Sequence, residues 1–276
     1  MIQLTHLSKR FGDKIAVNDL NMILEPGKVM GLIGQNGAGK TTTFRMILNF
    51  IVPTSGTITW DNRPITQKDK QKIGFLPEER GLYQKLTIEE QILYFAELHG
   101  MSRADAKSEL THWLKRLDVV GKASDKVQSL SKGNAQKVQM IASLIFKPEF
   151  IILDEPFSGL DPVNTSIMMS EIMRMRDQGA MIIFSSHDMN NVTKISDNLT
   201  MLKQGKSILQ GGVQEIREQF GRTKVYIEGP FSREELAHLP GVINVIPQGA
   251  GFDLTITEDH VGHDIFTYVT KNGYIP

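Results

Sequence analysis

The amino-acid sequence predicts an α/β fold, in which helices cover a parallel sheet, followed by a small α+β module. A short apolar run at Val29–Ile33 leads through a glycine-rich turn into a helical pattern over residues 40–50. A second apolar run, Phe150–Leu153, precedes a helical pattern over residues 161–179 and a third run, Ala180–Ser185. Because strand, helix and strand in succession form a crossover connection, these runs belong to parallel strands.

The segment before the first parallel strand is predicted to be β-structure. Ile2–Phe11 and Ile15–Leu24 are alternating runs, and the turn at residues 12–14 separates them. We therefore expect a mixed β subdomain beside the parallel core.

Residues 86–145 are predicted to be a helical insertion. Thr87 and Glu90 have the spacing of a capping box, and Ser102 with Asp105 repeats a helix-start signal. Three leucines then share one helical face: Leu110, Leu114 and Leu117.

Residues 222–276 are predicted to be a separate module after a first domain of residues 1–221. The pattern of strand, helix, two strands and helix resembles a ferredoxin-like split βαβ unit. The expected elements are residues 224–228, 232–239, 242–247, 251–257 and 260–272. A last strand is barely begun at residues 274–276, as expected of a truncated chain or of a sheet without one edge. The module has no catalytic constellation, which favours a regulatory or dimerisation role.

Composition excludes several kinds of site. Lysine and arginine total 31 and so do aspartate and glutamate, so no net charge favours nucleic acid as a partner. The absence of cysteine excludes disulfides, thiolate metal sites and a cysteine nucleophile. The N-terminus has no signal-peptide pattern, and apolar runs such as Met140–Phe146 are shorter than the ~20 residues that span a bilayer. We expect no direct membrane insertion, so transport would need another polypeptide.

Residues 34–41, GQNGAGKT, match the phosphate-binding pattern G-x-x-x-x-G-K-[ST]. Its glycines let the backbone wrap so that N–H groups meet phosphate oxygens, and the following helix directs its positive end at the same anion. Lys40 is expected to reach the β- and γ-phosphates, and Thr41 to offer a hydroxyl to Mg²⁺. The expected ATP contacts of this loop are Gly34, Gln35, Asn36, Gly37, Ala38, Gly39, Lys40, Thr41 and Thr42.

Residues 150–156, FIILDEP, bring two carboxylates to the end of an apolar strand, where open parallel sheets bind ligands. We expect Asp154 to hold Mg²⁺ and Glu155 to act as general base on the attacking water. An acidic pair after a strand is by itself weak evidence of a catalytic site, because carboxylates at strand ends are often only exposed to solvent. Together with the phosphate loop it becomes a strong indication.

The segment Leu130–Gln136, LSKGNAQ, resembles the LSGGQ signature of ABC ATPases. Ser158–Asp161 is similar to the D-loop of that family, and His187 in SSHDM to its switch histidine, which implies a catalytic role beside Lys40 and Glu155. The resemblance covers residues 2–221 and implies a P-loop cassette with a RecA-like core. The ATP contacts that it implies outside the phosphate loop are Phe11, Glu78, Ser131, Gly133, Asn134 and Asp161.

Three positions depart from the family pattern. Lys132 replaces the first glycine of the signature, and Asn134 replaces its glutamine. Glu78 stands where the Q-loop glutamine is usual; a carboxylate accepts from water and ligates Mg²⁺ but cannot donate a hydrogen bond.

The resemblance implies ATP and Mg²⁺ as cofactors and two partners: a second cassette, expected to be a copy of this chain bound head to tail, and a transmembrane permease. It implies a cytoplasmic subunit held at the inner face of the membrane by that permease. The sequence LPEERGLY at residues 76–83 and the C-terminal module resemble the ABC-2 exporter branch, which includes sodium-extrusion and drug-resistance ATPases.

The sequence is also compatible with other interpretations. A soluble ABC ATPase acting on ribosomes or nucleic acid is the alternative function, although one cassette, no sustained heptads and a neutral charge argue against it. Core packing of Phe11, a structural role of His187 and a solvated loop at Glu78 are the alternatives, although the order of the motifs favours the roles given above.

Overall fold

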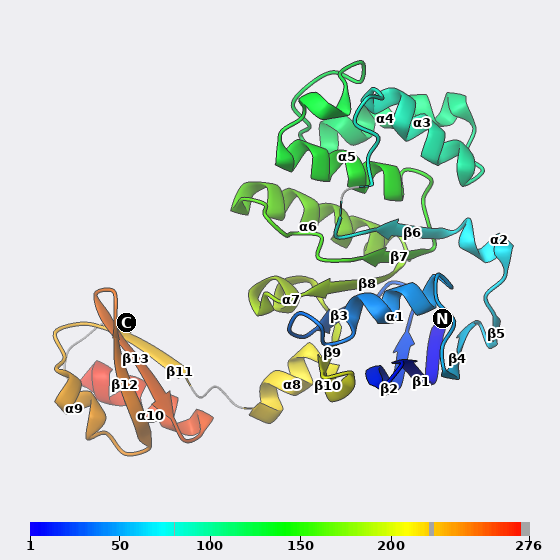
Figure 1. Cartoon of the computed structure of the whole chain (residues 1–276). Coiled ribbons are helices and arrows are strands. Elements are labelled where there is room, and N and C mark those ends of the chain that lie inside the picture. The colour runs from blue at the N-terminus through cyan, green and yellow to red at the C-terminus, as the bar shows by residue number, and fades with distance from the viewer. Residues whose placement is uncertain (80, 221–223, 272–276) are drawn as a thin grey trace. The chain divides into compact units, whose positions relative to one another are not determined.

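The computed structural model describes residues 1–79, 81–220 and 224–271, and the chain forms two compact units, residues 1–211 and 212–276 (Figure 1). The division expected from the sequence, at 221/222, lies after helix α8 (Val213–Phe220), whereas the compact units separate before it.

The first sheet of the larger unit is antiparallel, with strand order β2-β1-β4-β5. Its strands are β1 (Ile2–Phe11), β2 (Lys14–Leu24), β4 (Ser55–Trp60) and β5 (Arg63–Pro64). The predicted hairpin of β1 and β2 is confirmed, while β4 and β5 were not predicted. Trp60 packs edge-on against Phe150 of the second sheet, with ring centroids 6.1 Å apart, and so joins the two sheets in one core.

The second sheet has the order β10-β9-β3-β8-β7-β6, and the strands from β9 to β6 pair in parallel. Its strands are β3 (Val29–Ile33), β6 (Ile73–Leu76), β7 (Phe150–Leu153), β8 (Met181–Ser186), β9 (Asn198–Lys203) and β10 (Lys206–Gly212). Every residue of β3, β7 and β8 is buried, because helices cover a parallel sheet on both faces (Figure 1). Helices beside it are α1 (Lys40–Ile47), α6 (Pro162–Asp177) and α7 (Met189–Ile195), while the short α2 (Gln67–Lys70) lies on the connection from β5 to β6.

The helical insertion contains α3 (Ile88–Leu98), α4 (Arg103–Arg116), the 3-10 turn η1 (Val127–Ser129) and α5 (Lys132–Leu144). The capping box of Thr87 and Glu90 is confirmed, and Ser102 caps α4 by accepting from the Asp105 N–H. Two of the three leucines on the predicted face, Leu110 and Leu117, are buried. Leu114 is only half-buried, whereas the larger Trp113 is buried in its place.

The smaller unit has the predicted order of elements: β11 (Lys224–Glu228), α9 (Arg233–Ala237), β12 (Val242–Gln248), β13 (Gly251–Ile256) and α10 (Asp259–Lys271). Its described strands form an antiparallel sheet in the order β11-β13-β12, with a small apolar core of its own. That is the order of the first three strands of a ferredoxin-like unit. The strand expected at residues 274–276 lies outside the described residues.

Candidate active site

The phosphate loop, residues 34–39, connects β3 to the first turn of α1. Gly39 has a φ of 112°, and a Cβ there would lie 2.5 Å from the Ala16 carbonyl oxygen. Gly37 has a φ of 80°. Both positions therefore need glycine, because each allows the tight turn by which the loop enters α1.

The loop forms one wall of a cavity of about 460 Å³. Eleven residues expected at the site line this cavity: Phe11, Asn36, Gly37, Ala38, Gly39, Lys40, Thr41, Thr42, Glu78, Asp154 and Glu155. Gly34, Gln35 and His187 line an adjoining cavity of about 490 Å³, which shares Asn36, Gly37 and Ala38 with the first. Phe11 is 50% exposed at the cavity wall, so the core-packing interpretation is wrong.

The two acidic residues, Asp154 and Glu155, follow β7 and contact the neighbouring strand β8. Ser185 of β8 donates its hydroxyl hydrogen to Asp154 Oδ1 over 2.6 Å and accepts the Glu155 N–H over 2.8 Å. Glu155 has a φ of 48°, a left-handed conformation that non-glycine residues seldom adopt. Such strain persists where the surroundings over-determine a residue, as at active sites.

The Glu155 carboxylate lies between two other site residues. Its Oε2 is 2.9 Å from His187 Nδ1, and its Oε1 is 3.4 Å from Lys40 Nζ. Lys40 also donates to the Gly34 carbonyl over 2.7 Å. Glu155 is only 7% exposed, and its Oε1 has no hydrogen-bond partner among the described residues. This buried acceptor can take a hydrogen bond from a bound water.

The signature segment lies elsewhere, and none of its residues lines the 460 Å³ cavity. Ser131 caps α5 by accepting the Asn134 N–H over 3.3 Å and is exposed. The Asn134 side chain pairs with both backbone groups of Val120, at 3.2 and 3.3 Å. A Cβ on Gly133 would approach Asn164 Nδ2 to 3.1 Å.

Asp161 is the N-cap of α6, as the sequence indicates, and it does not line the cavity. Hydrogen bonds from the Asn164 N–H and side chain hold the pKa of Asp161 below its ordinary value. The structure therefore brings the phosphate loop, the two carboxylates, Glu78 and Phe11 together, with His187 beside them, and keeps the signature and Asp161 apart from them.

Sequence reasoning missed three residues that position this site. Ser185 holds the acidic pair, Gln136 donates to the Pro156 carbonyl over 3.2 Å, and Gln139 donates to the Pro77 and Glu79 carbonyls over 3.2 and 3.3 Å. The available signal was the presence of two glutamines inside an apolar helical pattern. A buried amide needs partners from neighbouring segments.

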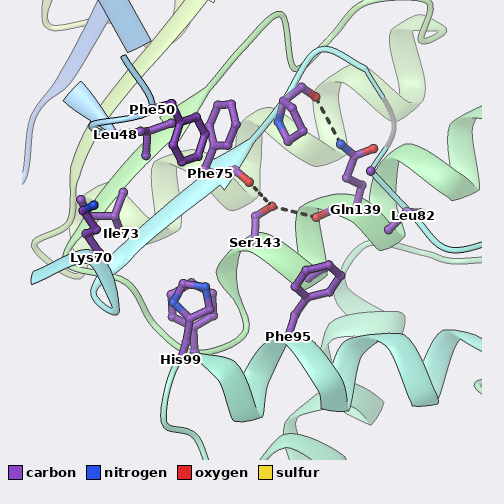
Figure 2. Close-up of a pocket in the computed structure, with 14 residues that line it drawn as sticks. Leu48, Phe50, Lys70, Ile73, Phe75, Leu82, Phe95, His99, Gln139 and Ser143 are labelled. Carbon is purple, nitrogen blue, oxygen red and sulfur yellow. Dashed lines mark hydrogen bonds between the residues drawn. The ribbon is translucent and has the colours of Figure 1, made fainter. Parts of the chain in front are cut away.

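A second feature of the helical insertion is a largely apolar groove of about 440 Å³ (Figure 2). It is bounded by α5, by the end of α3 and by the segment around β6, and it contains Phe75, Phe95, His99, Gln139 and Phe146. The His99 ring stacks on Phe146 with centroids 3.7 Å apart, and its Nδ1 lies 2.9 Å from the Gln71 carbonyl oxygen.

Sequence comparison places these features in a family. Residues 17–158 match the ABC transporter family, and residues 211–276 match the C-terminal domain of DrrA1-3-like ATP-binding proteins. The ABC transporter ATP-binding protein YhaQ of Bacillus subtilis (strain 168) is 41% identical over 275 residues, which cover 100% of this chain and 92% of YhaQ. Nod factor export ATP-binding protein I of Burkholderia lata is 32% identical over 233 residues, covering 83% and 77% of the two chains.

A solved structure, that of the ATP-binding subunit of an ABC transporter, superposes on this chain with a TM-score of 0.74 at 28% identity. The match covers 80% of this chain and 93% of the other. The phosphate loop, the acidic pair with its histidine and the separate signature are thus accompanied by similarity along the whole chain. The chain belongs to the family of ABC transporter ATP-binding proteins and is an ATP-hydrolysing transport subunit.

Proposed function

We propose that two copies of this chain close head to tail around ATP and drive an exporter whose substrate path lies in a separate permease. The observation that carries the proposal is the 460 Å³ cavity, which joins Lys40, Asp154 and Glu155 yet includes no signature residue. A site with a phosphate loop on one copy and Ser131 and Gly133 on the other accounts for both facts.

Within one copy, Lys40 binds the β- and γ-phosphates, and N–H groups of the loop and of the first turn of α1 donate to them. The donor set suits Mg²⁺, which is bound through one or two carboxylates together with substrate phosphates. The Thr41 hydroxyl and the Asp154 carboxylate would hold the ion, with Glu78 at the same cavity, and it would neutralise phosphate charge. Phe11 stacks on the adenine from the cavity wall.

Glu155 acts as general base. Its Oε1 faces Lys40 Nζ at 3.4 Å but has no hydrogen-bond partner among the described residues, and it accepts a hydrogen bond from the attacking water. His187 holds the other carboxylate oxygen. The water oxygen bonds to the γ-phosphorus, the bond to the β–γ bridging oxygen breaks, and Glu155 takes the water proton. Loss of the γ-phosphate that both copies grip then lets the dimer open.

At the facing copy, the first turn of α5 turns its N–H groups and positive dipole end to the γ-phosphate. Ser131 and Gly133 are accessible for this contact. The Asn134 side chain is engaged by Val120, which favours support of the first turn over direct ATP contact. Asp161, at the start of α6, stays a predicted contact across the dimer.

The 440 Å³ groove is proposed to seat a cytoplasmic segment of the permease. In the described part of the chain, no helix has the length and apolar character needed to span a bilayer, so a transport subunit of this kind works with a membrane protein. The groove is mostly apolar and borders the loop that carries Glu78. The subunit would thereby lie at the inner face of the membrane. Export as the direction is supported by the similarity to the Nod factor export ATP-binding protein I of Burkholderia lata.

Residues 1–221 are proposed to act as the ATPase cassette and residues 222–276 as an accessory module. The module has its own core, built around Leu236, Val245 and Leu254, and shows no catalytic constellation among its described residues. We propose that it stabilises the dimer or regulates hydrolysis. Deletion after Arg222 should change the dimerisation constant or the turnover rate; unaltered values for both would refute this role.

The test of the proposed function is magnesium-dependent ATP hydrolysis as a function of protein concentration. We expect activity to rise faster than linearly in the wild type and to vanish in Lys40→Ala and Glu155→Gln. Glu155→Gln should still bind ATP and accumulate the closed dimer, because it keeps the side-chain shape but cannot take the proton. Strictly linear wild-type activity, or robust turnover by Glu155→Gln, would contradict the dimer or the assigned base.

A further inference from the structure

Helix α5 has a polar stripe that the nucleotide site does not use directly. Gln136, Gln139 and Ser143 are all buried, and each donates to a backbone carbonyl of another segment. Ser143 donates to the Phe75 carbonyl of β6 over 2.8 Å, and Figure 2 shows this bond beside Gln139. Through this stripe, the helix that begins with the signature also contacts the acidic motif and the loop after β6.

Gln139 contacts that loop on both sides of Glu78. Its Nε2 lies 3.2 Å from the Pro77 carbonyl oxygen and 3.3 Å from the Glu79 carbonyl oxygen. Two acceptors facing one end of the amide fix its orientation, with nitrogen toward the loop. Glu78 itself is exposed at the 460 Å³ cavity. Gln139 thus holds the backbone on both sides of this carboxylate.

The other end of the same amide is unpaired. Gln139 is 3% exposed, and its Oε1 has no hydrogen-bond partner among the described residues. Gln139 also lines the 440 Å³ groove. A buried acceptor without a partner is unfavourable, and a hydrogen-bond donor brought into the groove relieves it.

We propose that Gln139 is a positioning residue that connects the groove to the nucleotide cavity. Its Nε2 holds the Glu78 loop, and its Oε1 accepts a hydrogen bond from a donor group of the permease segment in the groove. This inference rests on the proposed permease role of the groove. The Gln139 amide is then the physical link between occupancy of the groove and the position of Glu78.

The first test measures the loop directly and does not depend on catalysis. The chain contains no cysteine, so Glu79→Cys gives a single site for a nitroxide spin label next to Glu78. Gln139→Met keeps the length of the side chain but removes both the donor and the acceptor. We expect it to raise label mobility, whereas the control Ser143→Ala, which lies on the same helix and groove, leaves the mobility unchanged. Equal mobility in the wild type and Gln139→Met would overturn the holding role.

In the transporter assembled with its permease, the label should become less mobile in the wild type and stay mobile in Gln139→Met. The same immobilisation in both would overturn the acceptor role, while leaving the holding role to the measurement on the isolated chain.

A double-mutant cycle tests whether Gln139 acts through Glu78. In the assembled transporter, Gln139→Met should lower kcat about tenfold with little change in the KM for ATP, and it should cause no further loss in a Glu78→Ala background. An equal loss in both backgrounds, or none in the wild type, would overturn the proposal. The Lys40→Ala variant reports separately whether the proposed ATPase site itself is correct.

Discussion

The phosphate-loop half and the signature half of the proposed site differ in how far one chain completes them. Lys40 is 6% exposed and Glu155 7% exposed, and both are held by neighbours from the same chain. Ser131 and Lys132, in contrast, are exposed at the start of α5. The first half is preorganised before any partner arrives. In the second, the helix cap and the pairing of Asn134 with Val120 are in place, and in the proposed dimer closure would bring it to the phosphates.

The largest loss of activity is expected when a negative charge is introduced into the signature. Gly133→Asp should reduce ATP hydrolysis at least about 100-fold, because the new carboxylate would face the γ-phosphate and repel it across the dimer. Binding of ATP to the single chain should stay unchanged. The matched control is Gly133→Asn, which has the same size without the charge and should retain clearly more activity in the same hydrolysis assay.

Mixing Gly133→Asp with Lys40→Ala sharpens the same comparison. Each variant alone should have little or no activity, but a head-to-tail pair of the two contains one intact phosphate loop facing one intact signature. We expect the mixture to recover part of the wild-type activity. A mixture that stays inactive while still forming dimers would show that the two halves do not meet across the interface.

Removal of the histidine that contacts Glu155, in the phosphate-loop half, should lower ATP hydrolysis less. His187→Ala removes the contact to Glu155 Oε2 and should lower kcat about 10- to 100-fold, with the affinity for ATP nearly unchanged. His187→Gln, which keeps a hydrogen-bond donor, should recover part of the loss. A change confined to the KM for ATP, measured by steady-state hydrolysis, would show that His187 serves binding only.

The preorganised half is also the part that the sequence predicts best. Strand β3, the turn with Gly37 and Gly39, and the start of α1 all follow from local backbone chemistry, and the structure agrees at each. Caps such as Thr87 and Ser102 are equally local, because a side chain and an N–H three residues later decide them. The order of elements in the C-terminal unit was predicted for the same reason.

What the sequence did not reveal depends on contacts between distant segments. Ser185 and Gln139 act on residues 31 and 60–62 positions away, and their own sequence neighbourhood gives no sign of these partners. On α4, Trp113 is fully buried and its neighbour Leu114 is not. This is also a packing effect, because helical spacing permits either residue on the buried face. The left-handed backbone of Glu155 follows no propensity rule and was not predicted.

A substitution that removes hydrogen bonds from the signature half without adding a charge should reduce turnover less than Gly133→Asp does. Asn134→Leu removes both bonds to Val120, and we expect turnover to fall about two- to fivefold and the free energy of unfolding to fall by about 1–2 kcal/mol. Asn134→Gln restores the family residue and tests whether a longer amide still reaches Val120. Turnover and urea unfolding are measured on the same variants. A loss as large as that of Gly133→Asp would instead indicate direct ATP contact by Asn134.

The smallest expected effect is a pH dependence that belongs to the groove and not to either half of the site. Burial lowers the pKa of His99 below its ordinary value, although the bond to the Gln71 carbonyl opposes this. The folded state therefore favours neutral His99. Its stabilising contribution is complete above the unfolded pKa of about 6.5 and declines as the pH falls toward the lower folded pKa.

His99→Phe keeps the stack on Phe146 and removes the titrating group. We expect the unfolding temperature of the wild type to fall more than that of the variant between pH 7.5 and 5. Taking the difference between the two proteins cancels the titration of all other groups, and the exposed His112→Gln serves as control. Parallel curves for His99→Phe and wild type would mean that protonation of His99 costs the folded state nothing. The ring would then have enough contact with water to accept the charge, and the groove would be more open to solvent than its apolar lining indicates.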